Sequence, residues 1–185
     1  MKSYAELKTL IEDCGVHPQL GPVGRGYNIE QNPHELATFL VRMQELGVQS
    51  VLEIGTGYKA GLARFLAHEM GWTVTTVDVQ DYGHAEKYPD ITFEYTDGVE
   101  YPVWQHKFEL VFIDGSHTYD DVSFDYDYYS HYAAKAIAFH DIAGLRDCMG
   151  ARKFWWELRE TKKENKFWWS IAEDEQCAGI GWIER

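Results

Sequence analysis

The stretch of sequence that decides the fold is Glu53-Ile54-Gly55-Thr56-Gly57-Tyr58-Lys59-Ala60-Gly61. It follows the apolar run 48–54, which predicts a buried strand, and it leads into residues 60–70, whose apolar side chains repeat at helical spacing. Glycines in such a turn allow positive φ angles and let a ligand approach the backbone closely. The N-terminus of the following helix adds free N–H groups and the positive end of the helix dipole. The turn can therefore hold a phosphate or the charged end of a small cofactor, although tight packing between a strand and a helix also favours glycine.

Strand and helix patterns alternate on both sides of this turn. Strands are predicted over residues 48–54, 73–78, 91–95, 108–114 and 136–140, and helices over 3–13, 33–46, 60–70, 119–132 and 147–162. The last two strand patterns, 167–172 and 179–184, predict an antiparallel pair. Strands that alternate with helices indicate an α/β fold, with a mostly parallel sheet, helices on both faces and right-handed crossovers. The length of 185 residues fits one domain over 1–185.

The N-terminal part of the chain carries a clear helix start. Asn32 can cap the helix, Pro33 suits its first position, and Glu35 completes a pattern like a capping box. The preceding residues 15–32 are rich in glycine and proline, and we predict a loop there. Such a loop is either a lid over a binding site or a connector to the N-terminal helix over 3–13.

Composition and charge exclude several classes of partner. The chain has 17 Lys and Arg against 30 Asp and Glu, a formal net charge of −13, and no basic cluster longer than Lys162-Lys163. Nucleic-acid binding and attachment to an anionic membrane are therefore not expected. No apolar run reaches the roughly 20 residues of a membrane span, and no apolar signal core follows Met1. We expect a cytosolic protein whose three cysteines, Cys14, Cys148 and Cys177, are reduced.

Acidic residues follow several of the predicted strands. In a parallel sheet the ligand lies outside the carboxyl ends of the strands, so Gly55, Asp78, Asp97, Asp114 and Asp141 are expected on one rim. A carboxylate in the place of Asp78 can accept both hydroxyls of a ribose. The spacing of the glycines and Asp78 also satisfies the dinucleotide fingerprint, so an NAD-binding oxidoreductase is one alternative. Glu53 lies two residues before the first glycine of the turn, where its charge favours a cationic ligand over a pyrophosphate.

The stretch Glu53-Ile54-Gly55-Thr56-Gly57 resembles the first motif of class I S-adenosylmethionine (SAM) methyltransferases. Asp78 matches the ribose-binding acid of that family, and Thr96-Asp97-Gly98-Val99 matches the segment whose acid meets the adenine amino group. The resemblance covers about residues 30–145 and implies a Rossmann-like class I methyltransferase fold. It also implies that the cofactor SAM binds at Glu53, Gly55, Thr56, Gly57, Asp78, Asp97, Gly98 and Asp114.

The segments 112–119 and 139–142 are similar to those of small-molecule O-methyltransferases, including metal-dependent ones of the catechol and macrocin type. The resemblance implies a divalent metal at Asp114, His140 and Asp141, with His140 standing where catechol-type enzymes have an acid. Two carboxylates would suit Mg²⁺, and a histidine widens the choice to Mn²⁺ or Fe²⁺. His117 falls where those enzymes place a lysine base, so His117 and Asp114 are the candidate catalytic residues. The alternative is that the two histidines only orient loops through hydrogen bonds.

These features predict O-methylation of a small hydroxylated molecule, either with metal assistance or with a histidine acting alone as base. The rivals are the NAD-binding oxidoreductase and a non-catalytic binding protein on the same fold. Helix-like spacing is shared by Tyr119, Val122, Tyr126, Tyr129 and Tyr132, which are expected to be packing and interface side chains. The pairs Trp155-Trp156 and Trp168-Trp169 are expected mainly in the core, and exposed members would point to a homo-oligomer interface or to a wall of the acceptor pocket.

Overall fold

The computed structural model describes residues 1–14, 16, 17, 21, 22, 26–144, 148–172 and 178–185. Its helices are α1 (Tyr4–Cys14), α2 (Pro33–Glu45), α3 (Gly61–His68), α4 (His84–Lys87), α5 (Tyr119–Tyr129), the short 3-10 helix η1 (Ser130–Tyr132) and α6 (Met149–Thr161). Its strands are β1 (Val16–His17), β2 (Gly21–Pro22), β3 (Ser50–Ile54), β4 (Thr73–Asp78), β5 (Thr92–Tyr95), β6 (Phe108–Ile113), β7 (Ala133–Phe139), β8 (Lys166–Ser170) and β9 (Ile180–Glu184).

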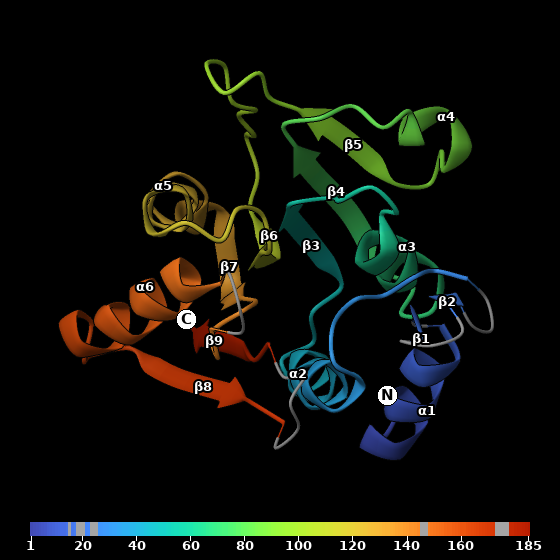
Figure 1. The fold of residues 1–185 in the computed structure, drawn as a ribbon, viewed down its shortest axis with the longest axis horizontal. Helices are drawn as coiled ribbons and strands as arrows, with labels where there is room; N and C mark the ends of the chain where they lie inside the picture. The colour runs from blue at the N-terminus through green and yellow to red at the C-terminus, as the bar shows by residue number, and fades with distance from the viewer. Residues whose placement is uncertain (15, 18–20, 23–25, 145–147, 173–177) are drawn as a thin grey trace.

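Seven of these strands form one twisted sheet in the order β5-β4-β3-β6-β7-β9-β8 (Figure 1). The five strands from β3 to β7 are parallel to their neighbours, whereas β9 runs antiparallel to both β7 and β8. This arrangement confirms the predicted Rossmann-like class I methyltransferase fold with an antiparallel strand at its C-terminal end. The chain reverses its direction of winding between β3 and β6, which places the ligand crevice outside the ends of these two strands.

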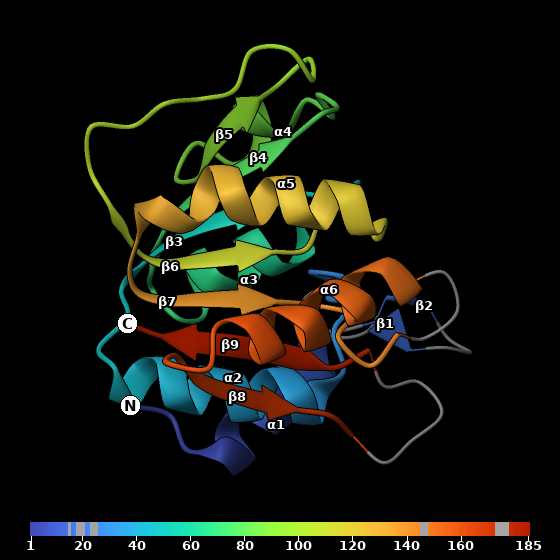
Figure 2. The same cartoon turned by 90° about the vertical axis from the view of Figure 1, so that its left-hand side faces the viewer.

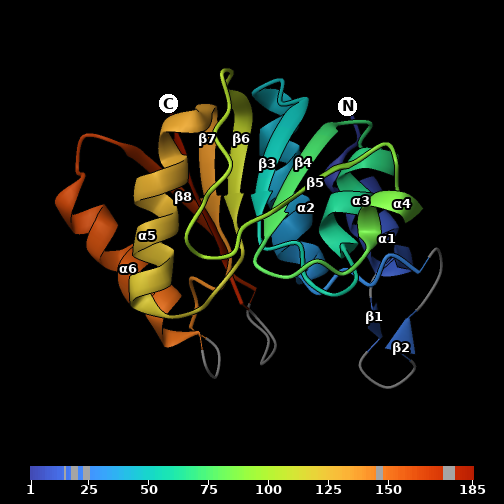
Figure 3. The same cartoon turned by 90° about the horizontal axis from the view of Figure 1, so that it is seen from above.

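Helices cover both faces of the sheet, as Figures 2 and 3 show: α5 and α6 lie on one face, and α1, α2 and α3 lie on the other. The side chains of β6 alternate between the two layers, so that Leu110 and Phe112 join the α2 side and Val111 and Ile113 join the α5 side. A strand that is buried on both faces needs apolar residues at every position. This explains the unbroken apolar run that marks β6 in the sequence.

Most predicted boundaries hold to within two residues, whereas the end of one helix and the start of one strand differ by three. The helix predicted over 60–70 begins only at Gly61, because Ala60 has a left-handed backbone with φ +48°. The helix predicted over 119–132 changes to the 3-10 form after Tyr129. The strand predicted over 136–140 begins at Ala133, because this residue pairs with Phe108 of β6.

The start of α2 confirms one part of its predicted cap and corrects another. The Asn32 side chain accepts hydrogen bonds from the backbone N–H groups of His34 and Glu35, as expected. The Glu35 side chain does not close a capping box. Its fully buried carboxylate instead accepts the backbone N–H groups of Ala172 and Gly179, at 2.8 and 2.9 Å. Glu35 therefore ties α2 to the region where β8 ends and β9 begins, and this burial raises the pKa of its carboxyl group.

Two pieces of secondary structure were not expected from the sequence. The stretch predicted as a loop contains the short antiparallel pair of β1 and β2. Residues 15, 18–20 and 23–25 of this stretch, on which the alternatives of a lid and a connector fall, lie outside the described residues. The four-residue helix α4 follows β4, and its sequence is too short to show a helical period. Cys177 also lies outside the described residues, whereas Cys14 and Cys148 are buried.

The aromatic predictions hold for α5 and fail in part for the tryptophan pairs. Tyr129 and Tyr132 are buried in the layer on the α5 side of the sheet. Trp155 is fully buried, but Trp156, Trp168 and Trp169 keep 36, 47 and 45% of their surface exposed. Core packing was therefore the wrong expectation for the pair in β8, because β8 is the edge strand of the sheet. Within the described residues, no helix combines the length and the apolar character that a membrane crossing requires.

Candidate functional site

The glycine turn after β3 lies directly against the loop that follows β6. Gly55 has φ +98°, and a Cβ atom at this position would lie 2.2 Å from the backbone oxygen of Asp114. The backbone N–H of Asp114 in turn donates to the carbonyl of Ile54 at 2.8 Å. Only glycine allows this contact between two loops. The first glycine of the motif is therefore required by the fold itself, before any ligand is considered.

The second glycine of the turn faces open space. Gly57 has φ +65°, and a Cβ atom built on it would meet no atom within 4 Å. Its backbone N–H donates to the Asp78 carboxylate at 2.9 Å, and the other oxygen of Asp78 accepts the backbone N–H of Gln80. The acid at the end of β4 is thus held in place beside the turn, next to an unfilled region of the surface.

Two cavities flank the glycine turn and share Gly55, Gly57, Asp114 and Gly115 in their walls. We name each cavity after one of the acids that line it. The Glu53 cavity has a volume of about 550 Å³, and the Asp78 cavity has a volume of about 500 Å³. Both volumes lie in the range of small-molecule sites. The turn therefore separates two hollows that one elongated ligand could fill together.

The Asp78 cavity combines acidic and apolar walls. Val77, Val79, Phe124 and Tyr129 supply apolar surface, and Thr96 and Asp125 are among its polar residues. Burial, and next to it the charge of Asp121, raise the pKa of the Asp125 carboxyl group to about 7. Asp125 could not be singled out from the sequence, because one acid among several in an acidic helix is not distinctive.

Asp97 and Gly98, the predicted adenine-binding residues, lie in the loop after β5 and are exposed. Neither lines the Glu53 cavity or the Asp78 cavity. The Asp97 carboxylate accepts the backbone N–H groups of Val99 and Glu100, which also lowers its pKa. The buried neighbour Thr96 lines the Asp78 cavity instead. The predicted site residues thus gather around the glycine turn, with Asp97 and Gly98 at its periphery.

Glu53 lies at the base of the other cavity. It is only 2% exposed, and its carboxylate accepts the hydroxyl of Thr76 at 2.6 Å. Thr76 also shares a hydrogen bond of 2.7 Å with the hydroxyl of Thr56, the residue between the two glycines. Burial raises the pKa of Glu53 to about 8, and the nearby charges of Asp114 and Asp78 act in the same direction. No cationic side chain is among the residues described as partners of Glu53. A cationic ligand would therefore offset the cost of burying this carboxylate.

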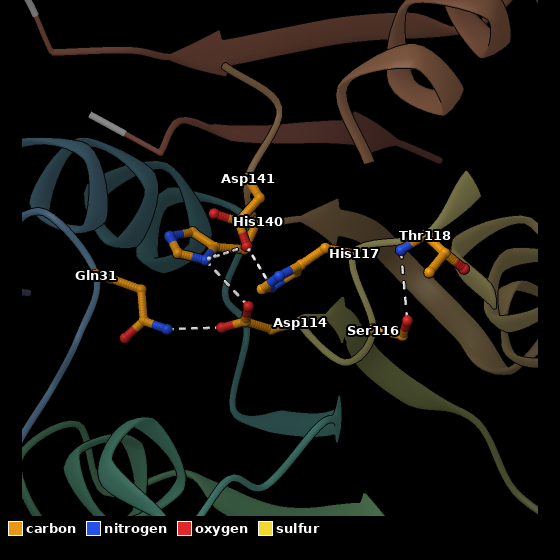
Figure 4. A network of polar contacts seen from close by, with 7 residues as sticks. All are labelled: Gln31, Asp114, Ser116, His117, Thr118, His140 and Asp141. Atoms are coloured by element: carbon orange, nitrogen blue, oxygen red, sulfur yellow. Dashed lines mark hydrogen bonds and ion pairs between the residues drawn. The ribbon is translucent and has the colours of Figure 1, made fainter. Parts of the chain in front are cut away.

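A network of polar side chains forms part of the wall of the Glu53 cavity (Figure 4). Gln31 donates to Asp114 at 2.6 Å, and His140 Nδ1 lies 3.0 Å from the other oxygen of Asp114. His140 Nδ1 is also 3.3 Å from Asp141 Oδ2, and the same oxygen lies 2.9 Å from His117 Nε2. Figure 4 shows these side chains pointing toward one another from the ends of β6 and β7 and from the segment before α2. The structure thus brings the predicted acids and imidazoles together.

The charges within this network stabilise one another. The hydrogen bond to Asp141 raises the pKa of His117. Burial alone would lower the pKa of His140, but Asp114 and Asp141 together raise it well above its usual value. Burial would raise the pKa of Asp141, but its hydrogen bonds with the two histidines hold it well below its usual range. The carboxylates and imidazoles of the network therefore face each other in pairs.

Two groups of side chains in this region could hold a metal ion. The ligand atoms of Asp114, His140 and Asp141, the predicted metal ligands, lie within 4.8 Å of one another. The same holds for a second group, His117, Asp141 and Cys148. Sequence reasoning missed both Cys148 and Gln31. The position of Cys148 at the start of the helix after β7 was the available signal, because that helix also begins at the ligand rim.

Comparison with solved structures shows the same fold in known methyltransferases. Similar folds include the O-methyltransferase from Bacillus cereus in complex with SAH (TM-score 0.59, 14% identity, covering 98% of this chain and 89% of that chain). A methyltransferase from Pyrococcus furiosus has a TM-score of 0.59 at 16% identity, covering 96% of this chain and 93% of the other. The O-methyltransferase of tomaymycin synthesis from Streptomyces achromogenes, in complex with SAM, has a TM-score of 0.53 at 14% identity. The match covers 78% of this chain and 76% of that chain.

No model of a protein family matches the sequence, and no curated protein gives a significant match. The similarity therefore lies in the fold, and this fold is the one found in SAM-dependent methyltransferases. It confirms the resemblance seen in the sequence.

Proposed function

We propose that this chain, as one domain over residues 1–185, is a SAM-dependent methyltransferase that methylates a hydroxyl group of a small molecule. The observation that carries the proposal is the pair of cavities on either side of the glycine turn, one lined by the buried Glu53 and the other by Asp78. SAM is an elongated cofactor with an amino group and a sulfonium at one end and an adenosine at the other. When bound, it supplies a methyl group that is ready for displacement.

The residues around the turn fit this cofactor. Glu53 is a buried acid with no cationic partner described, so it suits the amino group. The open space above Gly57 lets a ligand cross the turn, and the Asp78 carboxylate stands where ribose hydroxyls would lie. The apolar walls of the Asp78 cavity suit the adenine ring, with Thr96 and Asp125 as its polar contacts. Asp97 and Gly98 would border this end from outside.

The polar network of the Glu53 cavity suits activation of a hydroxyl group. His117 is the most exposed member of the network, with 44% of its side chain accessible. Asp141 binds its Nε2 atom and thereby holds the tautomer that leaves Nδ1 free to accept a proton. Asp114 lies at the junction of the two cavities, where it orients His140 and Gln31. We assign His117 as the base and Asp114 as the residue that positions the acceptor.

The group Asp114, His140 and Asp141 would hold a divalent metal. Two carboxylates and one imidazole suit Mn²⁺ or Fe²⁺ better than Mg²⁺, which prefers an all-oxygen set. A bound ion would lower the pKa of the acceptor hydroxyl and orient it. The ring nitrogen of His140 that faces both carboxylates is Nδ1, at 3.0 Å from Asp114 Oδ1 and 3.3 Å from Asp141 Oδ2, so this nitrogen would be the metal ligand.

The test is methyl transfer from labelled SAM to a panel of phenols, catechols, sugar alcohols, amines and thiols, with EDTA, Mg²⁺ or Mn²⁺ present. We expect a methylated hydroxyl product, and His117→Gln should lower turnover by about 10²–10⁴-fold while the KM for SAM stays unchanged. The exposed His106 provides a control, since His106→Gln should leave turnover unchanged. Methylation of only amine or thiol acceptors would contradict the O-methyltransferase assignment. Equal turnover in His117→Gln would contradict the role of the base.

A further inference from the structure

The second group of ligand atoms differs from the first in its chemistry. A ring nitrogen of His117, an oxygen of Asp141 and Cys148 Sγ all lie within 4.8 Å of one another. They come from the loop after β6, the end of β7 and the position just before α6. Asp141 and Cys148 are each about nine-tenths buried, while His117 faces solvent. The group therefore has two ligands anchored in the protein and one that an incoming ion can reach.

The backbone around the group is fixed by close packing. A Cβ atom at Gly150 would lie 2.4 Å from the carbonyl oxygen of His117 and 2.3 Å from the backbone nitrogen of Tyr119, so only glycine fits there. The backbone N–H of Ala151 donates to the same carbonyl of His117 at 3.2 Å. The first turn of α6 is thus held against the loop that carries His117. This packing keeps Cys148 beside His117 before any ion arrives.

One nitrogen, one oxygen and one sulfur ligand form a donor set typical of Zn²⁺ and not of Mg²⁺. Zinc binds these atoms at about 2.0–2.3 Å in a tetrahedron, and a thiolate selects soft or borderline ions. From these bond lengths, neighbouring ligand atoms of a tetrahedral zinc site lie roughly 3.3–3.8 Å from one another. Side-chain adjustments of about 1 Å would close the group around an ion. Three protein ligands would leave one position for water.

We propose that His117, Asp141 and Cys148 form a Zn²⁺ site, and that Zn²⁺ bound there inhibits the enzyme. The inhibitory part rests on the proposed function, because zinc on His117 occupies the imidazole that serves as the base. Asp141 belongs to both metal groups, so an ion at this site also removes a ligand from the group with Asp114 and His140. The binding part rests on the geometry of the three ligands alone.

The binding test uses Co²⁺ as a spectroscopic probe for zinc, on the full chain treated beforehand with a chelator and a reductant. Co²⁺ should produce a near-ultraviolet thiolate-to-cobalt absorption band, and Zn²⁺ should displace it. Cys148→Ser should abolish the band, and His117→Gln should weaken Co²⁺ binding by more than tenfold. Cys14→Ala is the matched control, because Cys14 lies in the layer of α1 and should leave the band intact. A band that survives Cys148→Ser, or one that depends on Cys177, would overturn the site.

The regulatory test measures methyl transfer with added Zn²⁺. Turnover of the unaltered chain should fall as zinc is added, and Cys148→Ser should need more than ten times as much zinc for the same inhibition. Equal inhibition of both proteins would contradict the regulatory proposal. A cobalt band that depends on Cys148, in a protein without methyltransferase activity, would support the metal site and count against the proposed function. The two failures are therefore distinguishable.

Discussion

Glu53→Gln is expected to stabilise the ligand-free protein at alkaline pH and to weaken its binding of S-adenosylhomocysteine (SAH). Burial raises the pKa of Glu53 from 4.5 to about 8. Between these two values the folded state keeps a proton that the unfolded state releases, so stability falls as pH rises through this window and stays low above it. Glutamine has no proton to lose, and its amide oxygen can still accept the Thr76 hydroxyl.

The free energies of unfolding of the two proteins should therefore agree near pH 4.5 and separate by about 3–5 kcal/mol near pH 9. Urea denaturation at a series of pH values measures this difference. Glu109→Gln is the matched control, because Lys135 and backbone donors outweigh burial there and lower the pKa of Glu109, so that substitution should reduce stability. Parallel pH curves for Glu53→Gln and the unaltered chain would show that Glu53 carries no burial cost.

The same substitution should reduce SAH affinity by more than tenfold, because the amino group loses the buried carboxylate that we assign to it. A gain in stability combined with a loss of binding is typical of a residue kept for function. Calorimetric titration at pH 8 measures the affinity. Unchanged affinity would remove Glu53 from the cofactor site even if the stability prediction held.

The two glycines of the turn are expected to lose very different amounts of stability when the same methyl group is added. In Gly55→Ala the new Cβ atom would lie 2.2 Å from the backbone oxygen of Asp114 and 2.6 Å from its carbonyl carbon. Neither loop can move without separating β3 from β6, so we expect a loss of more than about 4 kcal/mol of stability, or failure to fold. Denaturation and the yield of folded protein measure this effect.

Gly57→Ala is the control for that result and a test of the ligand. Its Cβ atom would meet no protein atom, so only the positive φ angle of +65° is unfavourable, at about 1–2 kcal/mol. The fold should therefore survive, while the methyl group enters the space that we assign to the cofactor and lowers SAH affinity by more than tenfold. A folded Gly57→Ala protein that binds SAH normally would mean that the cofactor does not cross the turn there.

Much of the fold could be predicted because its central strands β3 and β6 are buried on both faces and are followed directly by a glycine and an acid. The apolar run of β6 and the turn after β3 are local patterns, and they decide the sheet and its rim. The extra residues at the start of β7 could not be predicted, since Ala133 is in a strand only because it pairs with Phe108. Likewise, nothing in the sequence shows that Glu35 binds the backbone of residues 172 and 179 instead of its own helix.

The candidate site could be predicted where its residues follow strands directly. Asp114, His140 and Asp141 lie together because the carboxyl ends of β6 and β7 are adjacent in the sheet. Gln31 and Cys148 escaped prediction because they come from segments next to helices, and their distance from the rim depends on how those helices pack. Asp97 follows the outer strand β5, and the turn that it stabilises holds its carboxylate outside the cavities.

The most direct test of the central claim is calorimetric titration of the chelator-treated protein with SAH and, separately, with NAD. We predict that SAH binds at one site per chain with micromolar or tighter affinity, that NAD gives no binding heat, and that Gly57→Ala weakens SAH binding. Binding of NAD without binding of SAH would contradict the account and favour a dinucleotide-dependent oxidoreductase. Binding of neither ligand would leave the fold without the cofactor on which the proposed activity depends, and would contradict the account as well.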